Sequence, residues 1–243
     1  MLYADGTFRN RKDNMENQIP VVELELYLIR HGQSEGNLER DNSKLTLKEA
    51  NDPYLTEKGL HQAEKLGEAL SKIDFDAVYS SALLRAVQTA AETVKRQSEE
   101  KPLYILPLLT EVSIAKEYAG AGMREITEIC PSARLAFGVD ENSPLVYHNE
   151  YEDEAGMFAR AEEAIRYFRS LYKNGEKIAV VNHAAFMTFA VFHIMGFKAA
   201  PVFDIDFKNT AVTKVIFYKH GTNKYGDIVF EYINSTKHLT EKY

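Results

Sequence analysis

A run of mostly apolar residues from Val21 to Ile29 constrains the fold of this chain more than any other segment. Its second half, Leu26-Tyr27-Leu28-Ile29, is apolar on both faces, whereas a strand with one side in water alternates between apolar and polar residues. Strands buried on both faces occur in mostly parallel sheets that helices cover from both sides. The run therefore predicts a buried strand of an α/β fold.

The rest of the chain alternates between short apolar runs and segments with helical periodicity. The predicted strands are 75–79, 103–106, 177–181, 212–218 and 228–233, and the predicted helices are 56–72, 82–97, 157–172 and 184–195. This order predicts a three-layer α/β/α sandwich with a mostly parallel central sheet, and the last two strands should form an antiparallel hairpin. Residues 1–20 are expected to be a loosely attached arm and residues 21–243 a single domain. Residues from about 112 to 150 have mixed composition and no clean period, which predicts an inserted cap.

The net charge of −7 argues against nucleic-acid binding as the main task, because a phosphate backbone requires a basic surface. An anionic ligand would instead need a local basic pocket. No apolar stretch approaches the length needed to cross a bilayer, and the first residues lack the apolar segment of a secretory signal. The single cysteine, Cys130, cannot form an internal disulfide, which fits a reducing compartment. These features predict a cytoplasmic protein that binds neither nucleic acid nor membrane, and they leave its oligomeric state open.

Reactive side chains follow four of the predicted strands. Arg30 and His31 end the first strand, His183 follows the strand 177–181, Glu111 follows 103–106, and Arg85 lies one helical turn beyond the strand 75–79. Ligands of open α/β sheets bind outside the carboxyl ends of the strands, so these five side chains are expected to converge on one pocket.

Those residue types together suit phosphoryl transfer. A phosphoryl group carries about two negative charges near neutral pH, which Arg30 and Arg85 would bind through paired hydrogen bonds. A neutral His31 can attack phosphorus, and a protonated His183 can donate to the phosphoryl oxygens. Glu111 can give a proton to the leaving oxygen and later activate water. Each residue alone is more often structural, and only the set points to catalysis. The remaining histidines and Cys130 show no metal-ligand spacing, so we infer no metal and no cofactor.

Four blocks of the sequence resemble the motifs of the histidine phosphatase superfamily, in its phosphoglycerate-mutase-like branch. Leu28–Asn37 is similar to R-H-G-[E/Q]-[S/T]-x-x-N, Leu55–Ala63 to L-T-x-x-G-x-x-Q-A, and Tyr79–Ala90 to S-S-x-L-x-R-A-x-Q-T-A, and Val180–His183 stands where the family has its second histidine. The blocks occur in the family's order between residues 26 and 190. Together they are a strong signal, whereas R-H-G alone would be weak.

The resemblance implies a role for each matching position. His31 would be the phosphorylated nucleophile and Glu111 the proton donor, with Glu117 as the alternative acid. The implied phosphate-binding residues are Arg30, Gln33, Asn37, Arg85 and His183. The expected activity is metal-independent hydrolysis of a small organic phosphate through a phosphohistidine.

Two departures from the mutase pattern bear on the choice of activity. Mutases have R-x-Y-G after their acid, and here Val112-Ser113-Ile114-Ala115 follows Glu111. The arginine pair with which mutases bind the substrate carboxylate falls at Gly138-Val139. These departures favour a phosphatase. A phosphoglycerate mutase and a non-catalytic scaffold that binds phosphorylated ligands are the alternatives.

The expected cap supplies candidates for substrate selection. Lys116, Tyr118 and Arg124 are the first of these. The aromatic and sulfur-containing residues of the same region, Tyr118, Met123, Phe137, Tyr147 and Tyr151, would suit a larger or less polar organic group.

Overall fold

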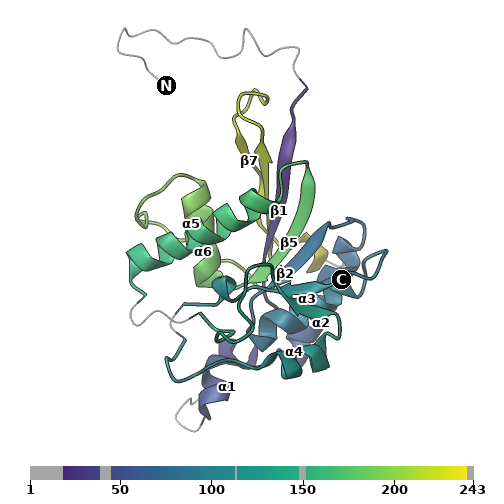
Figure 1. Ribbon diagram of the computed structural model, residues 1–243, viewed down its shortest axis with the longest axis vertical. Helices are drawn as coiled ribbons and strands as arrows, with labels where there is room; N and C mark the ends of the chain where they lie inside the picture. The colour runs from purple at the N-terminus through teal and green to yellow at the C-terminus, as the bar shows by residue number, and fades with distance from the viewer. Residues whose placement is uncertain (1–18, 39–44, 113, 148–151, 240–243) are drawn as a thin grey trace.

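The structure is a computed structural model that describes residues 19–38, 45–112, 114–147 and 152–239. Its centre is a seven-stranded sheet with the order β4-β3-β2-β5-β1-β6-β7 (Figure 1). The strands are β1 (Val22–Arg30), β2 (Ala77–Ser80), β3 (Leu103–Ile105), β4 (Ala133–Leu135), β5 (Glu176–Asn182), β6 (Val212–Tyr218) and β7 (Ile228–Ser235). The strands from β4 to β1 are parallel, and β6 and β7 form an antiparallel hairpin beside β1. The predicted fold class and the predicted hairpin are confirmed.

Helices cover both faces of the sheet, as Figure 1 shows. The α-helices are α1 (Leu47–Asn51), α2 (Glu57–Leu70), α3 (Leu84–Val94), α4 (Met123–Ile129), α5 (Glu154–Leu171) and α6 (Ala184–Ile194). Leu26 and Leu28 of β1 face the core shared with α5 and α6, and Tyr27 and Ile29 face the core shared with α2 and α3. Alternate residues of β1 therefore fill two separate cores, which explains why the run lacks a polar face.

Helix α2 begins after Thr56, as the sequence predicts. The side chain of Thr56 accepts a hydrogen bond from the backbone N–H of Gly59 and caps α2. This end of α2 packs directly on the loop after β1. A Cβ atom on Gly32 would lie 2.6 Å from the carbonyl oxygen of Gly59, and one on Gly59 would lie 1.9 Å from that of Gln33. Both glycines are therefore required for the close approach of the two backbones.

Part of the region expected to form a cap, about 112–150, belongs to the central sandwich. Within it, β4 pairs in parallel with β3 and extends the central sheet, and Ile126 of α4 is fully buried in the core beside α3. Residues 123–135 therefore belong to the sandwich. A three-residue strand and a two-turn helix are too short to give a clear period, so the sequence pattern concealed them. The division into an arm, a domain and a cap stays a prediction, and most of the expected arm, residues 1–18, lies outside the described residues.

Among the residues that the structure describes, no helix has the length and apolar character needed to cross a membrane.

Candidate active site

The side chains expected to converge lie together at the carboxyl edge of the sheet. Arg30 pairs with Asn182 at the ends of β1 and β5, so His31 and His183 follow at the same level. Their imidazole rings lie 5.1 Å apart, centroid to centroid. The parallel register of two adjacent strands therefore brings together two residues that are far apart in the sequence.

The His31 ring is held in one orientation by contacts to both of its nitrogens. Nδ1 lies 2.7 Å from the carbonyl oxygen of Gly32, which can only accept a hydrogen bond, so Nδ1 carries the proton. Nε2 accepts a hydrogen bond from Nε of Arg85 at 3.3 Å. The side chain is only 3% exposed, and burial, Arg85 and Arg30 hold its pKa well below the usual value. His31 therefore presents a neutral ring whose lone pair is on Nε2, toward Arg85.

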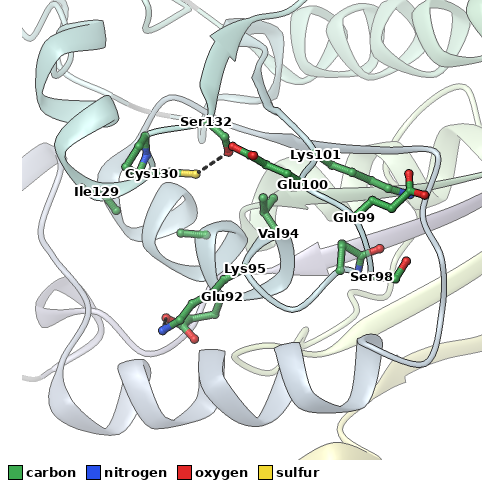
Figure 2. A pocket seen from close by; sticks show the side chains of 13 residues that line it. Glu92, Val94, Lys95, Ser98, Glu99, Glu100, Lys101, Ile129, Cys130 and Ser132 are labelled. Carbon is green, nitrogen blue, oxygen red and sulfur yellow. Dashed lines mark hydrogen bonds and ion pairs between the residues drawn. The ribbon is translucent and has the colours of Figure 1, made fainter.

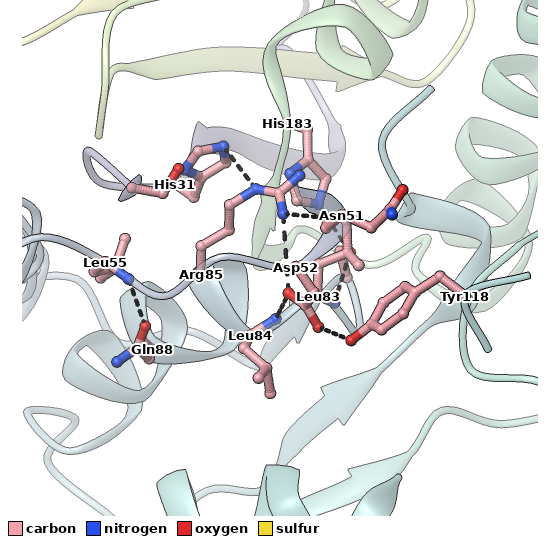
Figure 3. A network of polar contacts seen from close by, with 12 residues as sticks. His31, Asn51, Asp52, Leu55, Leu83, Leu84, Arg85, Gln88, Tyr118 and His183 are labelled. Atoms are coloured by element: carbon pink, nitrogen blue, oxygen red, sulfur yellow. Dashed lines mark hydrogen bonds and ion pairs between the residues drawn. The ribbon is translucent and has the colours of Figure 1, made fainter. Parts of the chain in front are cut away.

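Arg85 is held by a network that the sequence did not indicate (Figure 3). Its Nη1 donates to the carbonyl oxygen of Asn51 at 3.0 Å and lies 3.8 Å from Oδ1 of Asp52. The carboxylate of Asp52 is buried and accepts hydrogen bonds from the backbone N–H of Leu84 at 2.6 Å and the hydroxyl of Tyr118 at 2.8 Å. Burial raises the pKa of Asp52, and the neighbouring donors oppose that shift. Asp52 thus provides the countercharge of a buried arginine.

Arg30, the last residue of β1, directly precedes His31. Its Nη1 donates to the carbonyl oxygen of Phe207 at 2.5 Å, while its Nε is buried and has no hydrogen-bond partner among the described residues. Burial lowers the pKa of Arg30, and the charges of Glu111 and Asp206 oppose this. A buried donor without a partner is costly, and an oxyanion at this point would satisfy it.

His183 is fully buried, and its Nε2 lies 2.9 Å from the hydroxyl oxygen of Ser81. That hydroxyl oxygen also accepts the backbone N–H of Leu83, and its own proton can be donated to Nε2. Nδ1 would then carry the ring proton, and it is buried without a partner in the described part of the chain. Burial, Arg85 and His31 keep the pKa of His183 well below its usual value. The low pKa favours a neutral His183 ring, and the expected protonated form stays a prediction.

The carboxyl group of Glu111 lies at the start of α6. Oε1 accepts the backbone N–H of Phe186 at 3.0 Å and of Val112 at 3.0 Å, and Oε2 accepts that of Ala185 at 3.3 Å. The first turn of α6 follows His183 directly, so Glu111 lies at the same edge as both histidines. Glu117, the alternative acid, is exposed to solvent. Of the two candidates, Glu111 has the fixed position beside the site.

Gln33 and Asn37 are both tied into the loop that follows β1. Oε1 of Gln33 accepts a hydrogen bond from the hydroxyl of Thr56 at 3.0 Å. Oδ1 of Asn37 accepts the backbone N–H of Ser34 at 3.0 Å and the amide of Asn209 at 3.3 Å. These contacts fix the loop around His31, and a direct contact of either residue with phosphate stays a prediction.

The candidates for substrate selection have other positions than expected. The Tyr118 side chain is 7% exposed and its hydroxyl donates to Asp52, so it supports Arg85 rather than facing a substrate. The Arg124 side chain is 95% exposed on α4 and pairs with Glu128 at 3.6 Å, which places it on a solvated helix face. Lys116 is exposed, and its role stays a prediction.

The described aromatic and sulfur-containing residues of the expected cap lie in different places. Phe137 and Tyr147 line a cavity of about 410 Å³ at the β4 side of the sheet, together with Leu108 and Tyr167. Met123 packs against the core beside α3, and Tyr151 lies outside the described residues. Whether these residues shape a less polar substrate pocket stays a prediction.

A further cavity of about 580 Å³ lies at the amino ends of β3 and β4, away from the site edge (Figure 2). Its wall includes Lys101, two residues before β3, and Ser132, directly before β4. The buried thiol of Cys130 lies 3.5 Å from the Ser132 hydroxyl. The described residues contain no group of three or more His, Cys, Asp or Glu side chains placed to hold a metal ion.

The buried histidines predict how stability depends on pH. The pKa values of His31 and His183 lie well below 6.5 in the fold, and burial lowers that of His238 to about 4. Because the unfolded chain then binds more protons than the folded one, the free energy of unfolding should decrease as the pH falls below 6.5. Each histidine contributes up to about 1.4 kcal/mol per pH unit until its folded-state pKa is reached. Urea unfolding between pH 7.5 and 5.0 measures this slope, and a flat profile would contradict it.

Comparison with known proteins agrees with this geometry. The model of the family described as histidine phosphatase superfamily (branch 1) matches residues 26–225. Fructose-2,6-bisphosphatase TIGAR from Xenopus laevis is 33% identical over 120 residues, which are 49% of this chain and 41% of the relative. A 2,3-bisphosphoglycerate-dependent phosphoglycerate mutase from Bartonella henselae is 42% identical over 94 residues, 37% of this chain and 43% of the relative. The matched region thus spans less than half of each of these two relatives.

Among solved structures, a phosphoserine phosphatase mutant from Entamoeba histolytica in complex with phosphoserine superposes with a TM-score of 0.61. The two sequences are 23% identical, and the match covers 89% of this chain and all of the other. This likeness shows that the two proteins share a fold.

Proposed function

The chain belongs to the histidine phosphatase superfamily (branch 1), and from this premise we propose that it is a metal-independent phosphatase that hydrolyses a small organic phosphate through a phosphohistidine on His31. The observation that carries the proposal is the fixed tautomer of His31, because a protonated Nδ1 leaves the lone pair of the buried ring on Nε2. Arg30, Arg85 and His183 surround this ring with the donors that a phosphoryl group requires.

Binding of the substrate frees the nucleophile. Nε of Arg85 donates to Nε2 of His31 in the structure. When a phosphoryl oxygen enters, Arg85 transfers this hydrogen bond to the oxygen, and the lone pair of His31 becomes available for in-line attack. Nε of Arg30 and Nδ1 of His183, both buried without partners among the described residues, donate to the other oxygens. His183 performs this role as a neutral ring.

In the first step a bond forms between Nε2 and phosphorus while the bond from phosphorus to the leaving oxygen breaks. Glu111 gives its proton to that oxygen. The positive charge that develops on the His31 ring is stabilised by the hydrogen bond from Nδ1 to the carbonyl of Gly32. In the second step water attacks phosphorus while the bond from phosphorus to Nε2 breaks and its electron pair returns to the His31 ring. Glu111, now a carboxylate, takes a proton from the attacking water, and inorganic phosphate is released.

A panel of phosphorylated metabolites, assayed with the purified protein for release of inorganic phosphate, tests the proposal. We expect hydrolysis of at least one monoester at a rate that exhaustive chelation leaves unchanged. Binding of phosphorylated compounds without turnover would support a scaffold instead, and activity that only a divalent ion restores would contradict the mechanism.

The fate of the phosphoryl group separates a phosphatase from a mutase. A mutase must hold the carboxylate of its product beside the phosphohistidine, which requires a second cationic site. Gly138 and Val139, where mutases have their arginine pair, line the cavity at the β4 side of the sheet. We therefore expect release of inorganic phosphate with little interconversion of 2- and 3-phosphoglycerate. Both products are followed in one assay, and efficient isomerisation with negligible free phosphate would establish the mutase alternative.

A further inference from the structure

Arg160 of α5 is a buried cation that the proposed reaction does not use. Its side chain is 2% exposed and forms a two-bond pair with Glu152, from Nε to Oε1 at 2.5 Å and from Nη2 to Oε2 at 2.6 Å. Its Nη1 donates to the carbonyl oxygens of Leu108 at 3.1 Å and Thr110 at 2.5 Å. The guanidinium thus binds the backbone on both sides of residue 109.

Two aromatic rings pack against the same guanidinium. Its central carbon lies 4.9 Å from the centroid of Phe186 and 5.1 Å from that of Tyr147. Planar stacking combined with a fork of hydrogen bonds is specific to arginine, and a lysine cannot reproduce it. A buried ion pair is seldom more stabilising than apolar residues of the same volume, so stability alone is a weak reason for its presence here.

The contacts of Arg160 meet at Glu111 from two directions. Thr110, whose carbonyl Arg160 binds, directly precedes Glu111 in the chain. Phe186, on which Arg160 stacks, supplies the backbone N–H that binds Oε1 of Glu111 at 3.0 Å. One side chain therefore fixes both the segment that carries the carboxyl group and the helix end that receives it.

We propose that Arg160, held by Glu152, positions Glu111 for proton transfer to the leaving oxygen. The inference rests on the proposed function, because it assumes that Glu111 is the proton donor. Arg160 itself touches neither substrate nor the reacting atoms and acts only through Glu111. A displacement of about 1 Å at a catalytic group can lower a rate on the order of 100-fold, so loss of this contact should be measurable.

Leaving-group dependence tests the proposal, because aryl phosphates need little protonation of the departing oxygen and alkyl phosphates need much. Arg160→Lys should lower kcat/KM for both substrates. The loss for the alkyl phosphate should be at least about 10-fold larger than the loss for the aryl phosphate. The inhibition constant of inorganic phosphate should change by no more than about 2-fold, because this substitution leaves Arg30 and Arg85 in place. Arg169→Lys is the matched control: Arg169 lies on the same helix and stacks on Phe217, but its ion pair with Glu23 is at the surface.

Two further variants keep the outcomes distinct. Glu152→Gln keeps the size of the side chain that pairs with Arg160. It should show the same selective loss of kcat/KM for the alkyl phosphate, to a smaller degree. This variant tests the proposal if Arg160→Lys does not fold. Glu111→Gln is the reference. If it shows no preference between the two substrate classes, the acid assigned in the proposed function is wrong. If it is selective while both Arg160→Lys and Glu152→Gln affect the two classes equally, Glu111 remains the acid and the positioning role of Arg160 is overturned.

Discussion

Replacing His31 with alanine should abolish both the hydrolysis of an aryl phosphate and the formation of an acid-labile phosphoenzyme. We expect a loss in kcat of about 10⁴- to 10⁶-fold, the range found when a covalent nucleophile is removed. His183 is not expected to substitute, because its Nε2 is engaged by the hydroxyl of Ser81. An aryl substrate is the sharpest choice, since its hydrolysis depends least on the proton donor.

The phosphoenzyme is detected by rapid alkaline quench after incubation with a radiolabelled substrate, and part of each sample is then treated with acid. A phosphohistidine survives alkali and is lost in acid, which distinguishes it from a phosphoserine. His61→Ala is the matched control, because His61 is on the exposed side of α2 beside Glu64. If the His31→Ala protein still incorporates label or hydrolyses the substrate, the nucleophile is another residue.

The convergence of the site could be predicted because it follows from topology alone. Strands that run parallel in one sheet present their carboxyl ends at one edge, so residues after β1, β5, β2 and β3 had to meet once those strands were identified. The Arg30–Asn182 register places the two histidines at the same level without any loop to adjust them. The position of Glu111 followed for the same reason, with α6 supplying the backbone donors.

The supporting residues could not be predicted, because they depend on contacts that no local pattern records. Asp52 lies in a polar segment without period, and its partner Arg85 is on a helix far along the chain. Arg160 lies on the buried face of the amphipathic helix α5. In the sequence, a charged residue at that position only interrupts the helical pattern of apolar residues and gives no sign of its partners. Tyr118 was assigned to the substrate because its segment resembled an insertion. Its hydroxyl is instead part of the support of Arg85.

Removal of Arg85 is expected to have the second largest effect. Arg85→Ala should lower kcat for an aryl phosphate on the order of 10³-fold, since a guanidinium directed at a transferring phosphoryl group contributes about this much or more. Inhibition by inorganic phosphate should weaken in parallel. The variant also leaves Asp52 buried without its cation, which is expected to destabilise the fold by roughly 3 to 5 kcal/mol. A loss of activity in this variant alone would therefore be ambiguous.

The double variant Arg85→Ala with Asp52→Asn separates the two effects. Asparagine keeps an oxygen that accepts the backbone N–H of Leu84, its NH2 group can donate to the hydroxyl oxygen of Tyr118, and it carries no charge. Most of the lost stability should therefore return in urea unfolding. The rate should not return, because no donor then reaches the phosphoryl oxygen from this side of His31. Arg96→Ala, which removes an arginine paired with Glu92 near the far end of α3, serves as the control for arginine removal. If the double variant recovers both stability and turnover, Arg85 only balances the charge of Asp52 and the phosphate pocket must be built without it.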